Sequence, residues 1–297
     1  MPNEIADALK SLEKTAEALE IQTIEIDLLL EALFRRYGYD FRNYSRHSIE
    51  RRLAQYLTEN NYRSYLELAA ALIRNRIDFL NFLPYFSISV TALFRDPFFY
   101  AALRDKVLPI LKTWPHFKIW HAGCATGEEP YSMAILLDEH QLLERATLYA
   151  TDISSPALET ARLGIYSLET MKQGSANYMD YKGIASLSDY YHVKYGAAKI
   201  SSRIKKNIAF SRHSLVDDKS FGEMQLIICR NVLIYFNEQL KNQVLELFFE
   251  SLEFGGYLCL GDKESLMFSS VEHCFSVIDD KARIYKKITY KLKITSY

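Results

Sequence analysis

The stretch HAGCATGEEPYSMAILL, residues 121–137, decides the fold prediction for this chain. A short apolar run, FKIW at 117–120, leads into it, and two glycines separate that run from a segment with the apolar spacing of a helix. A strand that turns through glycine into a helix is the opening unit of a doubly wound α/β sheet. The stretch therefore predicts a strand through FKIWHAG and a helix over 130–143.

The chain after residue 98 continues this alternation of short apolar runs and helical segments. Further helices are predicted over 156–163 and 237–252. Residues 166–208 are rich in Tyr, Ser, Gly and Lys and break the alternation, so we expect an insertion of short strands or irregular hairpins there. The apolar runs with strand character are ATLYATDI (146–153), MQLIICRN (224–231), GGYLCLG (255–261) and RIYKKI (283–288).

Residues 1–83 show a different pattern, which is typical of a helical domain. Apolar positions recur at spacings of three and four, and Ser45, Ser48 and Ser64 stand where helix caps are expected. Pro84 ends this pattern, because proline disfavours helix at the preceding residue. The expected organisation is an all-α N-terminal domain over 1–83, a linker over 84–97 and an α/β domain over 98–297.

The composition argues against several classes of function. A formal net charge of −1 over 297 residues does not suit a broadly basic nucleic-acid-binding surface. The four cysteines form no C-x-x-C pair and the seven histidines no H-E-x-x-H motif, so neither a disulfide framework nor a zinc site is expected. Acids occur from the fourth residue on, and no apolar run approaches about 18 residues. We expect a cytoplasmic protein with no metal, no nucleic-acid partner and no direct membrane insertion.

Polar residues at the predicted strand ends indicate the ligand. Parallel strands place their carboxyl ends at one edge of the sheet, where α/β proteins bind ligands. Gly123 and Gly127 let the backbone approach a ligand, and Asp152 could accept hydrogen bonds from ribose hydroxyls. The turn lacks the G-x-G-x-x-G and Walker patterns, and Glu128 and Glu129 would repel a phosphate. A positively charged nucleoside, S-adenosylmethionine, fits this combination.

Each of these features also has a simpler explanation. Spaced glycines can serve strand-to-helix packing, and acids in the first turn of a helix complement its macrodipole. Asp152 could cap the following helix, a role that Ser154 or Ser155 could share. The nucleoside site is favoured because the features occur together, each at a predicted strand end, and because Arg230 and Asn231 follow a later strand in the same way.

Five blocks of the sequence resemble the CheR family, the chemotaxis-receptor glutamate O-methyltransferases. They are YSRHSIERRL, SVTALFRDP, GCATGEEPYS, ATDI with ALETARLGIY, and ICRNVLIYF. The resemblance implies an all-α N-terminal domain joined to a Rossmann-like class I methyltransferase domain with a small inserted β-subdomain. It also implies methylation of glutamate carboxylates on a helical, methyl-accepting receptor cytoplasmic domain, with S-adenosyl-L-homocysteine as the second product.

The resemblance also places the functional residues. Arg95 and Tyr235 would be catalytic, and Arg46, Arg51 and Arg52 would bind the acidic receptor. Glu129 would contact the methionine end of the cofactor and Asp152 its ribose, while Ser214 and Leu215 would flank the adenine. The complete set of cofactor-binding residues is Ser89, Thr91, Arg95, Gly123, Glu129, Asp152, Ser214, Leu215, Asn231 and Val232.

The sequence departs from the family pattern at a few positions. Ser89 and Ser214 stand where some members have asparagine, which changes the hydrogen bonds available to the adenosine. Members that dock a C-terminal receptor peptide carry a glycine-rich turn in the β-subdomain, whereas this chain has Gly196 followed by two alanines, so no peptide tether is expected. Two alternatives remain: a non-catalytic module that binds S-adenosylmethionine or S-adenosylhomocysteine, and a methyltransferase of a different carboxylate.

Overall fold

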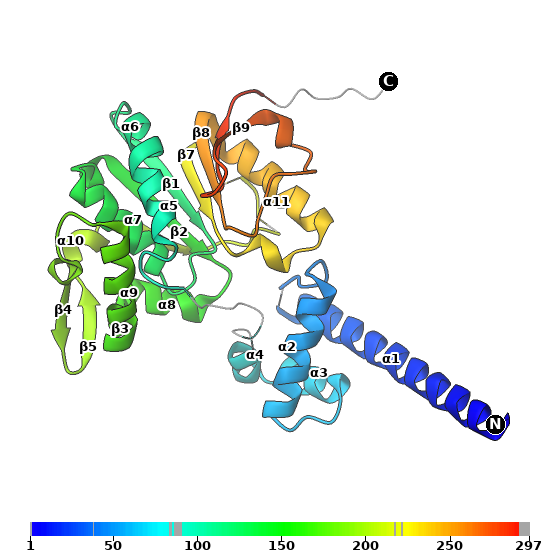
Figure 1. Ribbon diagram of the computed structural model, residues 1–297. Coiled ribbons are helices and arrows are strands. Elements are labelled where there is room, and N and C mark those ends of the chain that lie inside the picture. The colour runs from blue at the N-terminus through cyan, green and yellow to red at the C-terminus, as the bar shows by residue number, and fades with distance from the viewer. Residues whose placement is uncertain are drawn as a thin grey trace. The chain divides into compact units, whose positions relative to one another are not determined.

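The chain folds into two compact units, residues 1–88 and 89–297, coloured in chain order in Figure 1. The computed structural model describes residues 2–37, 39–82, 85, 91–216, 218–220 and 222–290. None of the described helices is long and apolar enough to cross a membrane.

The first unit is entirely helical in its described part, and its core follows the apolar periodicity of the sequence. Ile26, Leu30 and Leu33 lie on one stripe of α1 and are buried. Ser64 caps α3, because its hydroxyl accepts the Glu67 N–H at 3.1 Å. Ser48 instead lies inside α2. The helices are α1 (Pro2–Tyr37), α2 (Arg46–Glu59), α3 (Tyr65–Arg74) and α4 (Arg76–Phe82).

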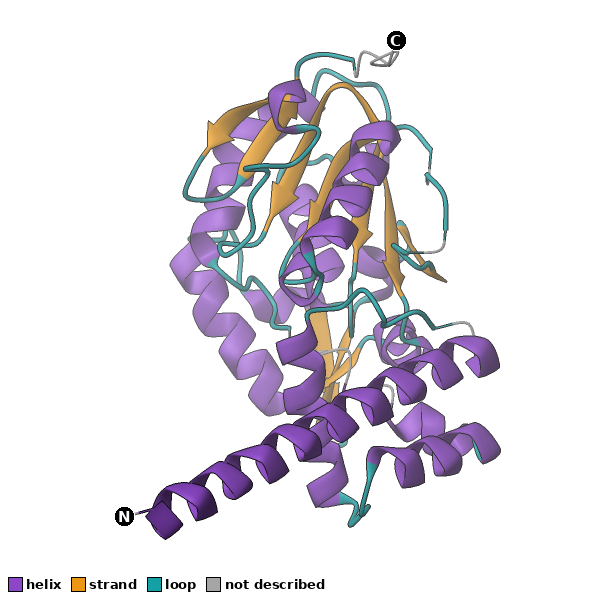
Figure 2. Cartoon of the chain, turned by 90° about the vertical axis from the view of Figure 1, so that its right-hand side faces the viewer, coloured by secondary structure: helices purple, strands orange, loops and turns teal. Residues whose placement is uncertain are grey.

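The second unit is built on a seven-stranded sheet with helices on both faces (Figure 2). The five neighbouring strands β6, β2, β1, β7 and β8 run parallel to one another, and β10 runs antiparallel to both of its neighbours, β8 and β9. This arrangement confirms the predicted doubly wound α/β fold. The strand order is β6 (Ile208–Arg212), β2 (Ala146–Asp152), β1 (Phe117–Ala122), β7 (Met224–Cys229), β8 (Leu252–Leu260), β10 (Ile284–Lys287) and β9 (Phe275–Asp279).

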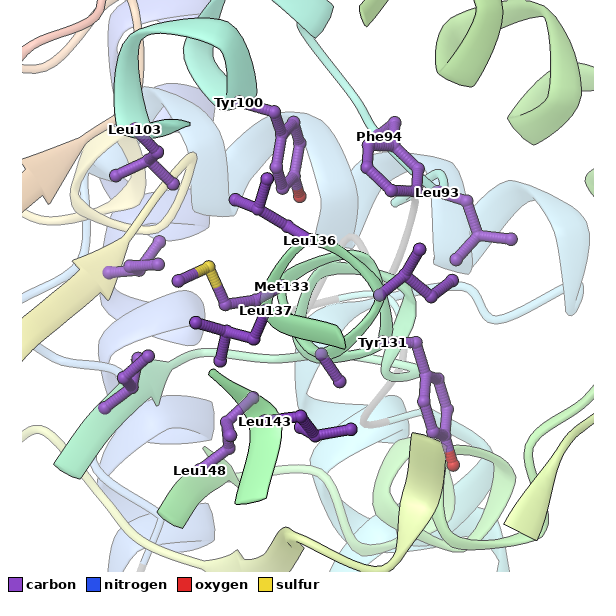
Figure 3. Packing of buried hydrophobic residues seen from close by; sticks show 14 of the residues in the cluster. Leu93, Phe94, Tyr100, Leu103, Tyr131, Met133, Leu136, Leu137, Leu143 and Leu148 are labelled. Atoms are coloured by element: carbon purple, nitrogen blue, oxygen red, sulfur yellow. The ribbon is translucent and has the colours of Figure 1, made fainter. Parts of the chain in front are cut away.

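Helix α7 (Glu128–Glu139) lies at the centre of the core of this unit. Its residues from Pro130 to Leu137 are all buried, so it has no polar face, and Figure 3 shows its side chains radiating in every direction. The helix ends four residues before the predicted Leu143. Apart from α9 and η4, which are described below, the other described helices of this unit are α5 (Pro97–Ala102), η2 (Leu103–Val107), α6 (Leu108–Leu111), η3 (Leu143–Arg145), α8 (Ser155–Leu163), α10 (Ser202–Lys205), η5 (Leu233–Tyr235), α11 (Glu238–Ser251) and η6 (Glu272–Cys274).

The insertion contains strands, as expected, but also a helix that the sequence did not indicate. Helix α9 (Leu168–Tyr181) includes Gly174, Ser175 and Asn177, residues with low helix propensity. Packing overrides propensity here, because a Cβ on Gly174 would lie 2.8 Å from Leu93 Cβ, so only glycine allows this contact. The insertion is completed by η4 (Leu187–Tyr190) and an antiparallel sheet of β3 (Ile165–Ser167), β5 (Ala197–Ile200) and β4 (Tyr191–Lys194).

Candidate functional site

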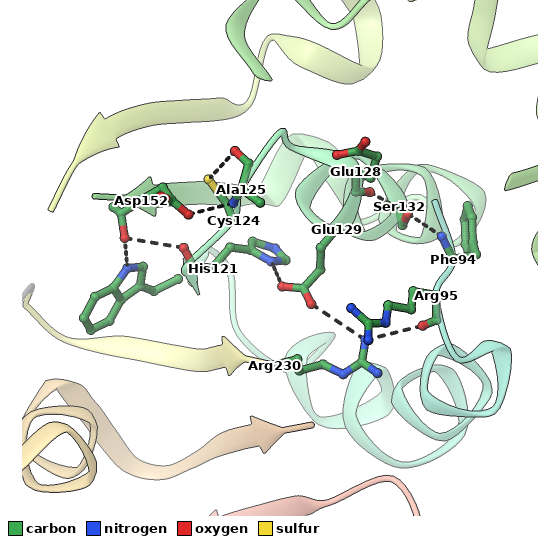
Figure 4. Close-up of polar contacts among 12 residues, drawn as sticks. Phe94, Arg95, His121, Cys124, Ala125, Glu128, Glu129, Ser132, Asp152 and Arg230 are labelled. Carbon is green, nitrogen blue, oxygen red and sulfur yellow. Dashed lines mark hydrogen bonds and ion pairs between the residues drawn. The ribbon is translucent and has the colours of Figure 1, made fainter. Parts of the chain in front are cut away.

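The carboxyl edge of the central strands gathers the predicted site residues. From β1 the chain adds β2 and β6 on one side and β7 and β8 on the other, so the topological switch lies between β1 and β7. Gly123 directly follows β1, Asp152 ends β2 and Asn231 lies just beyond β7. Glu129 lies in the first turn of α7, which starts above this edge (Figure 4).

The glycine turn has a conformation that its glycines make possible. Gly123 and Gly127 have φ of +82° and +96°, values that residues with a Cβ rarely adopt. A Cβ on Gly123 would lie 2.5 Å from Val232 Cγ2, so the glycine lets the loop after β7 pack directly on the loop after β1. The structure therefore brings together two predicted cofactor residues that are far apart in the sequence.

Asp152 is buried and fixes the shape of this turn. One carboxylate oxygen accepts the Ala125 N–H at 2.8 Å and the other accepts the Ser154 N–H at 2.8 Å. Ser154, and not Asp152, is the N-cap of α8. Burial raises the pKa of Asp152. Each carboxylate oxygen retains a second lone pair, so the carboxylate can hold the turn and still accept hydroxyl protons from a ligand.

Glu129 stands in a network that the sequence did not reveal. His121 Nδ1 lies 3.0 Å from Glu129 Oε1, and Arg230 Nη1 lies 3.7 Å from Glu129 Oε2. The Arg230 side chain is only 3% exposed; it also forms an ion pair with Asp96 and donates to the Arg95 carbonyl at 3.3 Å. Arg230 thus joins the start of α7 to the linker residues 95 and 96.

The two adjacent acids of the sequence motif play different parts. Glu128 points away from Glu129 (Figure 4) and accepts the Thr126 hydroxyl proton at 2.7 Å in a buried position. Burial raises the pKa of Glu128 to about 7. Only Glu129 therefore lies in the network with His121 and Arg230, and the expectation that both carboxylates face a cationic ligand does not hold for Glu128.

This burial predicts a pH-dependent cost in stability. The pKa of Glu128 rises from 4.5 to about 7 on folding, so the folded state retains a proton that the unfolded chain releases. The contribution of Glu128 to the free energy of unfolding therefore decreases as the pH rises from 4.5 to about 7. Above that range the buried carboxylate is charged and the full loss of stability is present. Glu128→Gln is expected to raise the free energy of unfolding at pH 8 by up to about 3 kcal/mol. Denaturant unfolding without cofactor would measure it, and an equal gain at pH 4.5 would contradict the assignment.

The linker is pinned to α7 and to the insertion. The buried Ser132 hydroxyl accepts the Phe94 N–H at 2.8 Å and donates to the Glu128 carbonyl at 2.7 Å. Asn177 of α9 donates to the Leu93 carbonyl at 2.9 Å. These bonds hold the segment that carries the half-buried Thr91 and Arg95. Ser89 lies outside the described residues.

The loop after β7 is held by a buried carboxylate that the sequence analysis missed. Glu264 accepts the N–H groups of Asn231 at 3.0 Å, Ile234 at 3.3 Å and Gly261 at 2.6 Å. Asn231 needs this support because its φ is +62°. The same loop carries Val232 and the half-buried Tyr235.

Ser214 and Leu215 follow the strand next to Asp152. The His213 N–H donates to the Asp152 carbonyl at 3.2 Å, which ties the end of β6 to the end of β2. Ser214 is buried in a turn, where its N–H donates to Asp218 Oδ2 at 2.7 Å and its hydroxyl accepts the Val216 N–H at 3.3 Å. Ser214 and Leu215, which are predicted to flank the adenine, therefore follow directly after a residue that is hydrogen-bonded to Asp152, the residue predicted to bind the ribose.

The three arginines of the first unit differ in their surroundings. Arg46 forms ion pairs with Asp27 and, at 2.7 Å, with Glu50. Arg52 is buried and donates to the Tyr85 carbonyl at 3.2 Å. Arg51 is exposed. Arg46 is thus engaged in ion pairs and Arg52 lies in the interior. Of the three, Arg51 is the one whose side chain is exposed and has no described ion pair.

The residues at the sheet edge fit S-adenosylmethionine. Glu129 offers a carboxylate to an ammonium group, and Asp152 offers oxygen acceptors to a ribose diol. The chemistry of this donor set matches a cationic nucleoside, as the sequence predicted.

Comparison with known proteins agrees with this geometry. Residues 89–284 match the CheR methyltransferase, SAM binding domain, and residues 24–83 match the CheR methyltransferase, all-alpha domain. A "Putative methyltransferase Cher3" of Pseudomonas putida is 45% identical over 89% of this chain and 97% of that protein.

Two proteins named "Chemotaxis protein methyltransferase" are also similar. The one from Listeria monocytogenes is 30% identical over 78% of this chain and 87% of its own length. The one from Vibrio parahaemolyticus is 34% identical over 68% of this chain and 72% of its own length. The chain therefore belongs to the CheR methyltransferase family, and its cofactor is S-adenosyl-L-methionine.

Proposed function

We propose that this protein transfers the methyl group of S-adenosylmethionine to glutamate side chains of a chemoreceptor-type signalling protein, giving glutamate methyl esters. The observation that carries the proposal is that Arg230 lies between Glu129 and the Arg95 carbonyl. It connects the carboxylate that we propose for cofactor binding to the linker segment that carries Arg95. The relatives named as chemotaxis protein methyltransferases support this choice of substrate class.

The positions of these residues support the roles that we propose for them in cofactor binding. Glu129 would take the ammonium group of the methionine end, and Asp152 the ribose hydroxyls. Bound S-adenosylmethionine supplies an electrophilic methyl group on its sulfonium. The remaining members of the proposed cofactor site are Thr91, Arg95, Gly123, Ser214, Leu215, Asn231 and Val232.

The protein's own contribution to the reaction is to position the acceptor. A glutamate carboxylate with a pKa near 4.3 is already ionised at pH 7, so the enzyme needs no general base. Arg95 would orient this carboxylate through two parallel hydrogen bonds, and the ring of Tyr235 would lie beside the cationic centre. Alignment of this kind can lower a barrier by about 7–11 kcal/mol at best.

The receptor would be recognised in part by the N-terminal unit. An acidic helical surface complements exposed basic side chains, and Arg51 is the arginine of α2 that is available for such a contact. Arg46 would bind the receptor only if its ion pairs with Asp27 and Glu50 were broken. Arg52 is hydrogen-bonded to the Tyr85 carbonyl, and we assign it to the fold of the unit instead.

A methyl-transfer assay tests the proposal. Purified protein is incubated with radiolabelled S-adenosylmethionine and a receptor cytoplasmic fragment, and base-released methanol is counted because methyl esters hydrolyse in base. Parent protein is expected to label the fragment, and a fragment with glutamine at the methylated positions is not labelled. Arg95→Ala is expected to lower turnover about 100-fold or more while it still binds S-adenosylhomocysteine, and Arg51→Glu to slow the reaction at low salt.

Three outcomes would contradict the proposal in different ways. Cofactor binding without any transfer would identify a non-catalytic binding module. A base-stable methyl product would indicate another acceptor group. Parent-like rates for Arg51→Glu at low salt would exclude the proposed receptor contact and leave the chemistry intact.

A further inference from the structure

His121 has a position that neither the family comparison nor the proposed reaction explains. It is fully buried near the end of β1, and its Nδ1 lies 3.0 Å from Glu129 Oε1 (Figure 4). Its second ring nitrogen, Nε2, is also buried and has no hydrogen-bond partner among the described residues. The ring therefore has one polar contact, and that contact is with Glu129.

The surroundings select one form of the ring. A carboxylate accepts hydrogen bonds only, so Nδ1 must carry the hydrogen that points to Glu129. A second hydrogen on Nε2 would be buried without an acceptor, which is unfavourable. The neutral Nδ1–H tautomer fits, and a neutral donor fixes the carboxylate without cancelling its charge.

The described ion pairs of Glu129 and Asp96 share a single guanidinium, that of Arg230. Arg230 lies near both Glu129 and Asp96, so one positive charge is shared between two carboxylates. With His121 neutral, the four residues His121, Glu129, Arg230 and Asp96 together carry one net negative charge. An ammonium group would balance it, and this balance favours a ligand with a free amine.

We propose that His121 is a positioning residue: it holds the Glu129 carboxylate in place for the ammonium group at the methionine end of the cofactor. The inference rests on the proposed role of Glu129. It predicts that His121 affects affinity only for ligands that carry the amino-acid end.

The test compares two ligands by calorimetry or competition. S-adenosylhomocysteine has the amino-acid end, whereas 5′-methylthioadenosine has the adenosine and the sulfur without it. His121→Leu is expected to lower the affinity for S-adenosylhomocysteine about 10-fold or more, and to change the affinity for 5′-methylthioadenosine by no more than about twofold. His121→Asn, whose amide nitrogen can occupy the place of Nδ1, is expected to restore most of the affinity, and His121→Gln is expected not to restore it.

The outcomes separate this inference from the function on which it rests. If His121→Leu loses affinity equally for both ligands, His121 only maintains the fold, and the proposal is overturned. A His121→Leu protein with the affinities of the parent would also overturn it. If the leucine variant does not fold, equal S-adenosylhomocysteine affinity in the Asn and Gln variants would overturn it. Glu129→Gln serves as the reference, and if it shows no selective loss, the role proposed for Glu129 fails and this inference fails with it.

Discussion

Arg230→Met is expected to lower the free energy of unfolding of the second unit by about 3–5 kcal/mol and to abolish methyl transfer. The side chain is 3% exposed, forms an ion pair with Asp96, and its guanidinium lies 4.1 Å from the Phe99 ring centroid. Methionine preserves the apolar packing on Phe99 but removes the guanidinium that pairs with Asp96 and Glu129. Urea unfolding of the full chain, followed by tryptophan fluorescence of the second unit, measures the change.

An arginine of the same unit whose partner is exposed provides the matched control. Arg283 pairs with Asp280 at 2.7 Å, but that aspartate is 80% exposed, so Arg283→Met is expected to cost less than about 1 kcal/mol. If the two variants are equally stable, the ion pairs of Arg230 contribute no more to the stability of the fold than the exposed pair of Arg283. Loss of activity with parent stability would assign Arg230 to the site alone.

The sequence was sufficient to place the candidate residues at the sheet edge, because strand ends are a local property of the pattern. Gly123, Asp152 and Asn231 each follow a recognisable apolar run, and parallel strands bring such positions together. The contact between Gly123 and Val232 joins two separate loops, and only the folded chain reveals that the glycine is required by a neighbouring side chain.

The residues that the sequence analysis missed are those whose role depends on burial. His121 occupies an ordinary strand position, and its contact with Glu129 becomes visible only in the folded chain. Glu264 lies in the polar segment GDKES, where nothing local separates it from an exposed loop acid. Arg52 shows the reverse case, because a charge that was expected at the surface is buried against Tyr85. Tertiary packing decides all three.

Asp152→Ala is expected to weaken S-adenosylhomocysteine binding by about 100-fold to 10,000-fold, measured by calorimetry. The estimate assumes two hydrogen bonds to a charged acceptor at about 1.5–3 kcal/mol each. Because Asp152 also accepts the Ala125 and Ser154 N–H groups, part of any loss could arise from a relaxed turn. Asp152→Asn retains one oxygen acceptor, so its affinity for S-adenosylhomocysteine is expected to lie between those of the alanine variant and the parent.

The 2′-deoxy analogue of S-adenosylhomocysteine separates these two causes, since it lacks one of the hydroxyls that Asp152 would bind. The parent is expected to lose about 10-fold or more in affinity for this analogue, and Asp152→Ala is expected to bind both ligands equally, because the partner of the missing hydroxyl is already gone. If the alanine variant discriminates as strongly as the parent, Asp152 acts through the turn and does not touch the ribose. The carboxylate would then serve only to hold the turn, and the acceptor for the ribose hydroxyls would lie on a neighbouring strand end.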